Sequence, residues 1–198
     1  MWLEIKALAI AVLVVAGTPG TGKTSVAREL ARRLGAEFVD LSEFALERGL
    51  VLEYDEESQS YVVDEERLVE GLARFVAGAG GKAVVATHYP EILPPDMVEL
   101  VAVLRLDPRE LERRLRGRGW PERKVRENVM AEVLGVVAAN ALEAFGEDKV
   151  VEVDATGKGV EEVVEEIVRA MTGPDRRGAR IDWLDVLAPE EVARYEWR

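Results

Sequence analysis

Cysteine is absent from this 198-residue chain, which excludes disulfide bonds and metal sites built on thiolates. Histidine occurs once, and the chain has one glutamine and two asparagines beside many Glu and Arg, a composition enriched in thermophile proteins. Long hydrophobic runs are missing too, since the apolar stretch 7–16 is too short to cross a bilayer. This stretch follows Lys6 as in a secretion signal, but cleavage there would destroy the motif that comes next. We therefore expect a cytoplasmic protein with no membrane partner.

Basic residues are outnumbered by acidic ones, 26 to 38, and the net charge of -12 argues against direct high-affinity binding of nucleic acid. The charge is distributed unevenly, because residues 37–70 hold twelve acids against two arginines, whereas residues 105–126 hold nine basic residues against four acids. A basic run is often a solvated helix face with i,i+4 ion pairs such as Glu110 with Arg114. The density of arginine before Gly119 also suits an anion, so both interpretations remain.

Residues 17–24 read Gly-Thr-Pro-Gly-Thr-Gly-Lys-Thr and match the pattern G-x-x-x-x-G-K-[ST]. An apolar stretch leads into the motif and a helical pattern leads out of it, a context that makes a chance match rare. Backbone N–H groups of such a loop, and the helix N-terminus, bind phosphates. Lys23 is then placed to reach the β- and γ-phosphates of ATP, and the Thr24 hydroxyl to ligate Mg²⁺. The residues expected to bind ATP here are Gly17, Gly20, Thr21, Gly22, Lys23, Thr24 and Ser25.

The rest of the chain alternates short β-branched runs with helical patterns, which is typical of an α/β fold with a parallel sheet covered by helices. The length suits one domain. The apolar runs predict five strands, near residues 10–16, 37–40, 83–87, 100–106 and 149–154. The helical patterns predict helices over 23–34, 41–48, 64–77 and 107–116, one long helix over 121–145, another over 159–171 and a short one from Pro189.

Further motifs follow the phosphate loop in a fixed order: Tyr54-Asp55-Glu56-Glu57, Asp64-Glu65-Glu66-Arg67, His88, Arg118-Gly119-Trp120, Lys124, Asn128 and Glu132. Over residues 12–171 the chain thereby resembles the adenylate kinase isoenzyme 6 family, small nucleoside monophosphate kinases also linked to small ribosomal subunit assembly. The resemblance implies a P-loop NTPase fold, a three-layer sandwich with a parallel five-stranded sheet. It further implies a kinase domain over 1–173, with a nucleotide-acceptor (NMP-binding) segment at 40–63 and a short lid at 117–127, before a C-terminal tail at 174–198.

The resemblance assigns catalytic roles to Lys23, Arg118 and His88. Arg118 stands between two glycines, which suits a hinge, and corresponds to the lid arginine that contacts ATP. The alternative is a surface arginine in a helix-to-helix turn. His88 follows a predicted strand at the edge where parallel strands open onto ligands, and corresponds to a histidine linked to ATP hydrolysis. The alternative is a histidine that merely caps a strand end.

The chain departs from the family's Asp-x-His motif, because the residue two positions before His88 is Ala86. The acid expected to bind Mg²⁺ or its waters is therefore missing there. Asp40, at the end of the second predicted strand, and Glu91 are the two candidates to replace it.

The acceptor segment departs as well. Monophosphate kinases usually hold the acceptor phosphate with an arginine on the helix after the second strand, and the aligned residue here is Leu46. Arg48 reaches the same ligand only if that helix ends early. The acids at 55–57 would repel a nucleotide phosphate and attract a basic protein, or they form a solvated loop.

Two further segments have two interpretations each. Residues 154–159 follow the last predicted strand and contain two glycines, so their backbone either contacts an adenine ring or forms an ordinary turn. The tail holds Trp183, Leu184, Val186 and Leu187, and either packs onto the core, the commoner outcome, or docks to a partner.

The expected function is an ATP-dependent adenylate kinase, ATP + AMP = 2 ADP, with ATPase activity. ATP and Mg²⁺ are its expected cofactors and AMP its acceptor. The resemblance adds a role in small-subunit biogenesis and rRNA maturation, with a basic small-subunit ribosomal protein as partner. The alternative is an ATP-gated assembly factor for that protein, with ATPase but little kinase activity. A kinase for another small metabolite is disfavoured by the match at residues 54–57.

Overall fold

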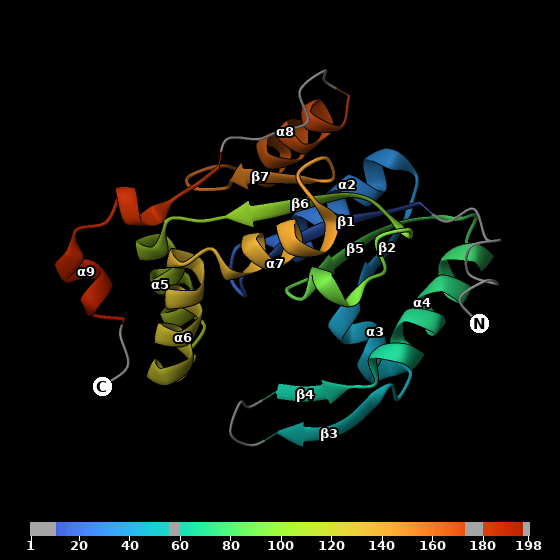
Figure 1. Cartoon of the computed structure of the whole chain (residues 1–198), viewed down its shortest axis with the longest axis horizontal. Coiled ribbons are helices and arrows are strands. Elements are labelled where there is room, and N and C mark those ends of the chain that lie inside the picture. The colour runs from blue at the N-terminus through green and yellow to red at the C-terminus, as the bar shows by residue number, and fades with distance from the viewer. Residues whose placement is uncertain (1–10, 56–59, 173–179, 196–198) are drawn as a thin grey trace.

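A five-stranded parallel sheet forms the centre of the computed structural model, which describes residues 11–55, 60–172 and 180–195 (Figure 1). The strand order is β2-β5-β1-β6-β7. All five predicted strands are confirmed within two residues, as β1 Ala11–Gly17, β2 Glu37–Asp40, β5 Lys82–Thr87, β6 Val98–Arg105 and β7 Val150–Asp154. Because every strand runs the same way, all five carboxyl ends lie along one edge of the sheet.

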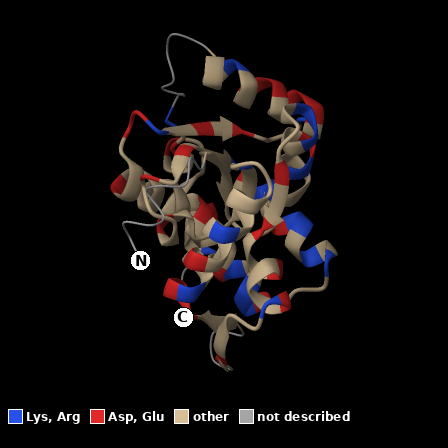
Figure 2. Ribbon diagram, turned by 90° about the vertical axis from the view of Figure 1, so that its right-hand side faces the viewer, with Lys and Arg blue, Asp and Glu red and all other residues tan. Residues whose placement is uncertain are grey.

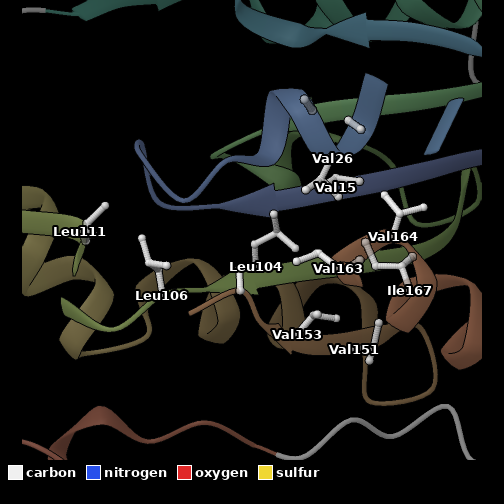
Figure 3. Close-up of a cluster of buried hydrophobic side chains, with 14 of the residues drawn as sticks. Val15, Val26, Leu104, Leu106, Leu111, Val151, Val153, Val163, Val164 and Ile167 are labelled. Atoms are coloured by element: carbon white, nitrogen blue, oxygen red, sulfur yellow. The ribbon is translucent and has the colours of Figure 1, made fainter. Parts of the chain in front are cut away.

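Helices cover both faces of the sheet and give the expected three-layer sandwich. One face packs against α2 (Lys23–Leu34) and α8 (Val160–Thr172), and the other against α3 (Leu41–Glu47), α4 (Glu65–Gly78) and α7 (Val136–Phe145). Strand side chains alternate between the two cores, as expected for strands buried on both sides. Figure 3 shows the first core, where side chains of β1, α2, β6, β7 and α8 gather in one cluster, labelled at Val15, Val26, Leu104, Val151 and Val163 among others.

The predicted long helix over 121–145 is wrong. The segment forms two helices, α6 (Glu122–Val133) and α7, which are bent by 51° at a break. Gly135 makes the break with a left-handed φ of 64°, a conformation that residues with a Cβ rarely adopt. The apolar pattern runs through this glycine without interruption, and a lone glycine does not by itself end a helical pattern. Among the described residues no single helix is long and apolar enough to span a bilayer, although this bent pair reaches the length and composition together.

The acceptor segment contains a hairpin that the sequence did not predict. Strands β3 (Val51–Asp55) and β4 (Ser60–Val63) pair antiparallel outside the main sheet, and Figure 1 shows them projecting beyond α3 and α4. Tyr54 and Tyr61 meet across the hairpin with ring centroids 5.0 Å apart. Most side chains of the hairpin are exposed on both of its faces. Its sequence therefore lacks the alternation of apolar and polar residues that predicts a half-buried strand. Glu56 and Glu57 lie outside the described residues.

The described part of the tail packs onto the core, the commoner of its two predicted outcomes. Trp183 and Leu187 are buried in the first core, whereas Leu184 and Val186 are exposed. The tail forms a short 3-10 helix at Trp183–Asp185 and the helix α9 (Pro189–Ala193). In Figure 1, α9 lies beside α5 (Pro108–Gly117) and α6. Figure 2 shows charges of both signs interleaved along the outer helices, while the central ribbons are mostly uncharged.

Candidate active site

The phosphate loop joins β1 to α2 at the carboxyl edge of the sheet, in the predicted strand-loop-helix context. Gly17, Gly20 and Gly22 all have positive φ angles, of 151°, 103° and 102°. A Cβ at Gly17 would lie 2.8 Å from the carbonyl oxygen of Leu104, and one at Gly20 would lie 2.7 Å from a Leu111 methyl. Glycine is therefore required at both positions by backbone conformation and by space.

The loop is held from inside and from α5. The Thr21 hydroxyl donates to the carbonyl oxygen of Thr18 at 2.9 Å, and Arg114 donates to the carbonyl oxygens of Gly20 and Thr21 at 3.4 Å. Gly22 caps α2 without a side-chain hydrogen bond, and the first turn of α2 carries no acidic residue. The N-terminus of a twelve-residue helix thus faces the loop with its partial positive charge available to an anion.

Lys23 begins α2, and its ammonium group lies near charges from two other elements. The pKa of Lys23 is lowered to about 8, chiefly by burial. The nearby charge of Asp40 acts to raise this pKa, and the charge of Arg118 acts to lower it. The predicted residues Lys23, Asp40 and Arg118 are therefore near enough to one another to interact electrostatically. A bound phosphate would raise the pKa of this lysine again, because a nearby negative charge favours the ammonium form. Lys23 is therefore suited to bind an anion.

Thr24 and Asp40 contact each other directly, since the Thr24 hydroxyl donates to Asp40 Oδ2 at 3.1 Å. Asp40 ends β2 and pairs in register with Ala86 of β5, the position where the expected acid is missing. Glu91, the other candidate, accepts a hydrogen bond from Asn140 at 2.6 Å. A hydroxyl and one carboxylate suit Mg²⁺, which takes few protein ligands and completes its shell with phosphate oxygens and water. No cluster of three His, Asp or Glu residues able to hold a metal by itself is found among the described residues.

His88 follows β5, and its pKa is lowered to about 4, chiefly by burial and then by the positive charge of Lys23. Asp40 raises this pKa and Lys124 lowers it. The ring lies 4.0 Å from the Tyr89 ring, centroid to centroid. His88 is thus a neutral imidazole at pH 7, placed among the charged groups of the candidate site rather than in a plain strand end.

Arg118 is the C-cap of α5 and is exposed. The other arginines of this helix have carboxylate partners: Arg109 pairs with Glu191, Arg113 and Arg114 with Glu110, and Arg116 with Glu112 and Glu122. The basic run is therefore largely the ion-paired helix face that its sequence allowed. Within the described residues Arg118 has no carboxylate partner, and its charge acts on Lys23.

A cavity of about 490 Å³ adjoins this group of residues. It lies between α3, the β3–β4 hairpin and the end of β5, and its volume is within the range of small-molecule sites. His88 lines it, which connects the cavity to the phosphate loop. Its other walls are mainly apolar and aromatic, and no lysine or arginine is among the described residues that line it. These are Leu41, Ser42, Ala45, Leu46, Val51, Ser60, Tyr61, Val62, Val63, Glu65, Leu68, Thr87, His88, Tyr89, Glu91 and Ile92.

Leu46 therefore lines the cavity where monophosphate kinases usually have an arginine. The helix α3 does end early, at Glu47, but Arg48 does not turn toward the cavity. Its guanidinium stacks on the rings of Phe44 and Phe75, at 4.3 and 5.2 Å from their centroids. The helix thus ends before Arg48, as the sequence required for Arg48 to reach an acceptor phosphate. The Arg48 side chain nevertheless packs against the two phenylalanine rings and not into the cavity.

Ser25 is exposed in the first turn of α2, and its backbone N–H donates to the carbonyl of Gly22 at 3.1 Å. The loop 154–159 lies at the same edge of the sheet as the phosphate loop. There the Thr156 hydroxyl accepts from the N–H of Asp107 at 2.9 Å, and Gly157 has a φ of 67°. Contact of this loop with an adenine ring remains a prediction.

A buried ion pair beside the phosphate loop was not predicted. Arg105, at the end of β6, and Glu132, in α6, are 3% and 2% exposed and lie 2.9 Å apart. Two signals were available: a carboxylate at position 132 on the apolar face formed by Val125, Val129 and Val133, and an arginine within a strand that is otherwise apolar at its carboxyl end. Neither signal identifies the other as its partner, because 27 residues separate them.

The fold and the site together define a P-loop kinase. Residues 13–135 match the family AAA_18, described as "AAA domain". Proteins named "Putative adenylate kinase" are similar over most of the chain: that of Saccharolobus islandicus is 40% identical over 174 residues, covering 87% of each chain, and that of Thermococcus kodakarensis is 40% identical over 186 residues, covering 93% of this chain and 98% of the relative. The protein of that name from Pyrococcus furiosus is 38% identical over 191 residues. The chain belongs to this family of archaeal kinases.

Solved structures support the fold alone. A shikimate kinase from Acinetobacter baumannii in complex with shikimate matches with a TM-score of 0.57 at 19% identity, covering 84% of this chain and 96% of the other. One from Bacteroides thetaiotaomicron matches with a TM-score of 0.50 at 17% identity. At these identities the neighbours indicate the P-loop kinase fold and carry no information on the substrate.

Proposed function

We propose that this protein is an adenylate kinase of the isoenzyme 6 type, which transfers the γ-phosphoryl group of MgATP to AMP and also hydrolyses ATP. One observation carries the proposal: Lys23, Thr24 with Asp40, His88 and Arg118 converge at the carboxyl edge of the sheet beside a cavity of about 490 Å³. The names of the relatives, putative adenylate kinases, point to the same acceptor.

The residues divide the work of phosphoryl transfer. Backbone N–H groups of the loop and the Lys23 ammonium bind the β- and γ-phosphates, and Arg118 adds positive charge where the migrating group carries its charge. Thr24 and Asp40 would hold Mg²⁺, which neutralises phosphate charge when bound. His88 is neutral at pH 7, so it can donate one hydrogen bond and accept another at the boundary between the loop and the cavity. The acceptor segment 40–63 contributes the cavity, and the lid 117–127 contributes Arg118.

A second candidate function rests on the cavity walls. The described residues of its lining include no lysine or arginine, so α3 supplies no clamp for the acceptor phosphate. An ATP-gated factor that acts on a basic small-subunit ribosomal protein, with ATPase activity and little kinase activity, needs no such clamp. Glu53, which is exposed on β3, would then contribute to binding the partner.

An assay of the purified protein with MgATP, with and without AMP, separates the two functions. ADP formation and phosphate release are measured independently. A kinase consumes AMP and forms two ADP for each AMP, beyond the ADP that accompanies any free phosphate. Phosphate release without consumption of AMP contradicts the kinase proposal and supports the second function, while loss of both activities contradicts both.

The Asp40→Asn variant tests the proposed Mg²⁺ site. Asparagine caps a helix as well as aspartate does, so α3 should remain intact. Loss of the carboxylate charge is expected to lower kcat/KM for MgATP by about a hundredfold and to raise the Mg²⁺ concentration needed for half-maximal rate. Rates are measured over a Mg²⁺ series at constant ATP. A larger loss in Glu91→Gln than in Asp40→Asn would show that Glu91 is the acid instead.

The affinity for ATP should depend on pH through Lys23. In the free protein the pKa of Lys23 is about 8, and bound phosphates favour its charged form. Below about pH 8 the lysine is already charged, so the Kd of MgATP should be constant. Above that pH, binding requires uptake of a proton, and the Kd should rise toward about tenfold per pH unit.

Equilibrium titrations between pH 6.5 and 9.5 measure this effect. Circular dichroism at each pH checks that the fold persists. A Kd that stays constant to pH 9.5 would contradict the proposed contact between Lys23 and the phosphates.

A further inference from the structure

The Glu132 carboxylate connects four segments of the chain. Its Oε1 atom accepts hydrogen bonds from Arg105 Nε at 2.9 Å, from the backbone N–H of Leu106 at 3.0 Å and from the indole N–H of Trp183 at 3.1 Å. Its Oε2 atom accepts from the hydroxyl of Thr18 at 2.6 Å. One buried side chain of α6 thus bonds to the end of β6, to the C-terminal segment and to the phosphate loop.

Arg105 completes the network from the other side. It donates to the backbone oxygen of Glu132 at 2.9 Å, to Glu152 at 2.5 Å and to the backbone oxygen of Ile181 at 2.8 Å. Its guanidinium lies against Gly135, where a Cβ would be 3.4 Å from two of its nitrogens. The break between α6 and α7 therefore lies in contact with this arginine, at the glycine that interrupts the predicted long helix.

Stability alone does not account for this arrangement. A buried ion pair adds little to stability compared with well-packed apolar residues, and an acid in the last turn of a helix opposes the helix dipole. Arg105 already has Glu152 as a second carboxylate. The hydrogen bond between Thr18 and Oε2 of Glu132 pairs none of the Arg105 donors. It attaches the network to the loop proposed to bind ATP.

Thr18 is the second residue of the phosphate loop and is 1% exposed. Its carbonyl oxygen accepts from both the hydroxyl and the backbone N–H of Thr21, at 2.9 and 3.2 Å, so its position determines the turn that follows. Backbone N–H groups bind phosphates well only when their directions are set in advance. A hydroxyl bonded to a buried carboxylate provides that constraint, since charge-assisted bonds are short and strong.

We propose that Glu132 is a positioning residue for nucleotide binding, which holds the phosphate loop through Thr18 and couples it to the C-terminal segment through Trp183. The segment 180–195 then contributes to nucleotide binding indirectly, because Trp183 and Thr18 each donate a hydrogen bond to the same Glu132 carboxylate. The inference rests on the proposed ATP site, and it assigns to the tail a role beyond covering the core.

The test compares the Kd of MgATP for Thr18→Val and Trp183→Phe with that of the wild-type chain. Thr18→Val keeps the shape of the side chain and removes its hydroxyl, so the Kd should rise about tenfold. Trp183→Phe keeps an aromatic ring and removes the N–H, and the Kd should rise about threefold. Because both changes act through one carboxylate, the double variant should show less than the product of the two effects.

Two further variants separate positioning from general stability. Thr18→Ser restores a hydroxyl and should recover most of the affinity lost in Thr18→Val. Tyr195→Phe removes another hydrogen bond of the C-terminal segment, to Glu112 at 2.9 Å, and should leave the Kd unchanged. The melting temperature of every variant is measured in parallel, without ATP.

The outcomes are distinct. Wild-type affinity in Thr18→Val overturns the positioning role, and so does failure of Thr18→Ser to recover affinity. A lower melting temperature of Trp183→Phe with an unchanged Kd overturns the coupling to the C-terminal segment. If the wild-type chain itself binds no MgATP, the proposed function fails and this inference fails with it, a result that no variant is needed to recognise.

Discussion

The Lys23→Ala variant is expected to lose at least about a thousandfold in kcat/KM for phosphoryl transfer, because it removes the one ammonium group of the phosphate loop. The pKa of this lysine is lowered chiefly by burial in the free protein, so its charge is poorly solvated until a phosphate binds. Both ATP binding and turnover should therefore fall. Equilibrium binding of MgATP and initial rates at saturating AMP measure the two effects separately.

Lys82→Ala is the matched control. Lys82 is exposed at the amino end of β5, on the opposite edge of the sheet from the phosphate loop, and its loss should change neither quantity. The fold of Lys23→Ala should be retained, since alanine favours the helix that begins at this position. A Lys23→Ala protein that binds and turns over ATP normally would refute the central claim about this site.

The Arg118→Ala variant is expected to lower kcat by about a hundredfold to a thousandfold while raising the Kd of ATP much less. Arg118 is exposed at the end of α5 and reaches Lys23 only through its field, so the free protein is not organised around it. Its charge matters most when the migrating phosphoryl group develops charge between the two nucleotides. Single-turnover rates and equilibrium binding distinguish a loss in the transition state from a loss of affinity.

Arg113→Ala provides the comparison on the same helix. Arg113 is exposed like Arg118, but it lies 3.9 Å from the carboxylate of Glu110. Its removal changes the net charge of α5 and its C-terminal end equally, so any effect of charge alone would appear in both variants. Equal losses in Arg113→Ala and Arg118→Ala would mean that Arg118 has no specific role.

The acceptor site shows why local sequence was an incomplete guide. The sequence places Leu46 where an arginine usually holds the acceptor phosphate, and it allows Arg48 to replace that arginine only if α3 ends early. The condition holds, but Arg48 stacks on two phenylalanine rings that come from different helices, α3 and α4. The contact with Phe44 is an i,i+4 pair within this segment. The contact with Phe75 depends on where α4 packs, which no pattern in residues 41–48 contains.

The proposed Mg²⁺ site is a second case. The sequence left Asp40 and Glu91 as the candidates to replace the acid missing at Ala86. The pairing of β2 with β5 places Asp40 directly beside Ala86, and its carboxylate accepts from Thr24. Strand order is set by how the helices pack on the sheet, and therefore only the folded chain distinguishes the two acids.

The sequence by itself determined the elements whose signals are local. The phosphate loop, the five strands and the start of α2 at Lys23 follow from glycine positions, β-branched runs and helical spacing, all within a few residues. It also determined the chemistry available at the site, because residue types do not change on folding.

Only the tertiary structure decided which distant groups meet. The Glu132 carboxylate bonds to Thr18 across 114 residues and to Trp183 across 51, and these contacts exist because α6 packs beside the phosphate loop and the tail returns to the core. Burial makes such contacts strong, since a carboxylate removed from water must find donors wherever the fold supplies them. The position of a buried polar group's partners is thus a property of the whole packed chain, whereas a glycine-rich loop is a property of its own eight residues.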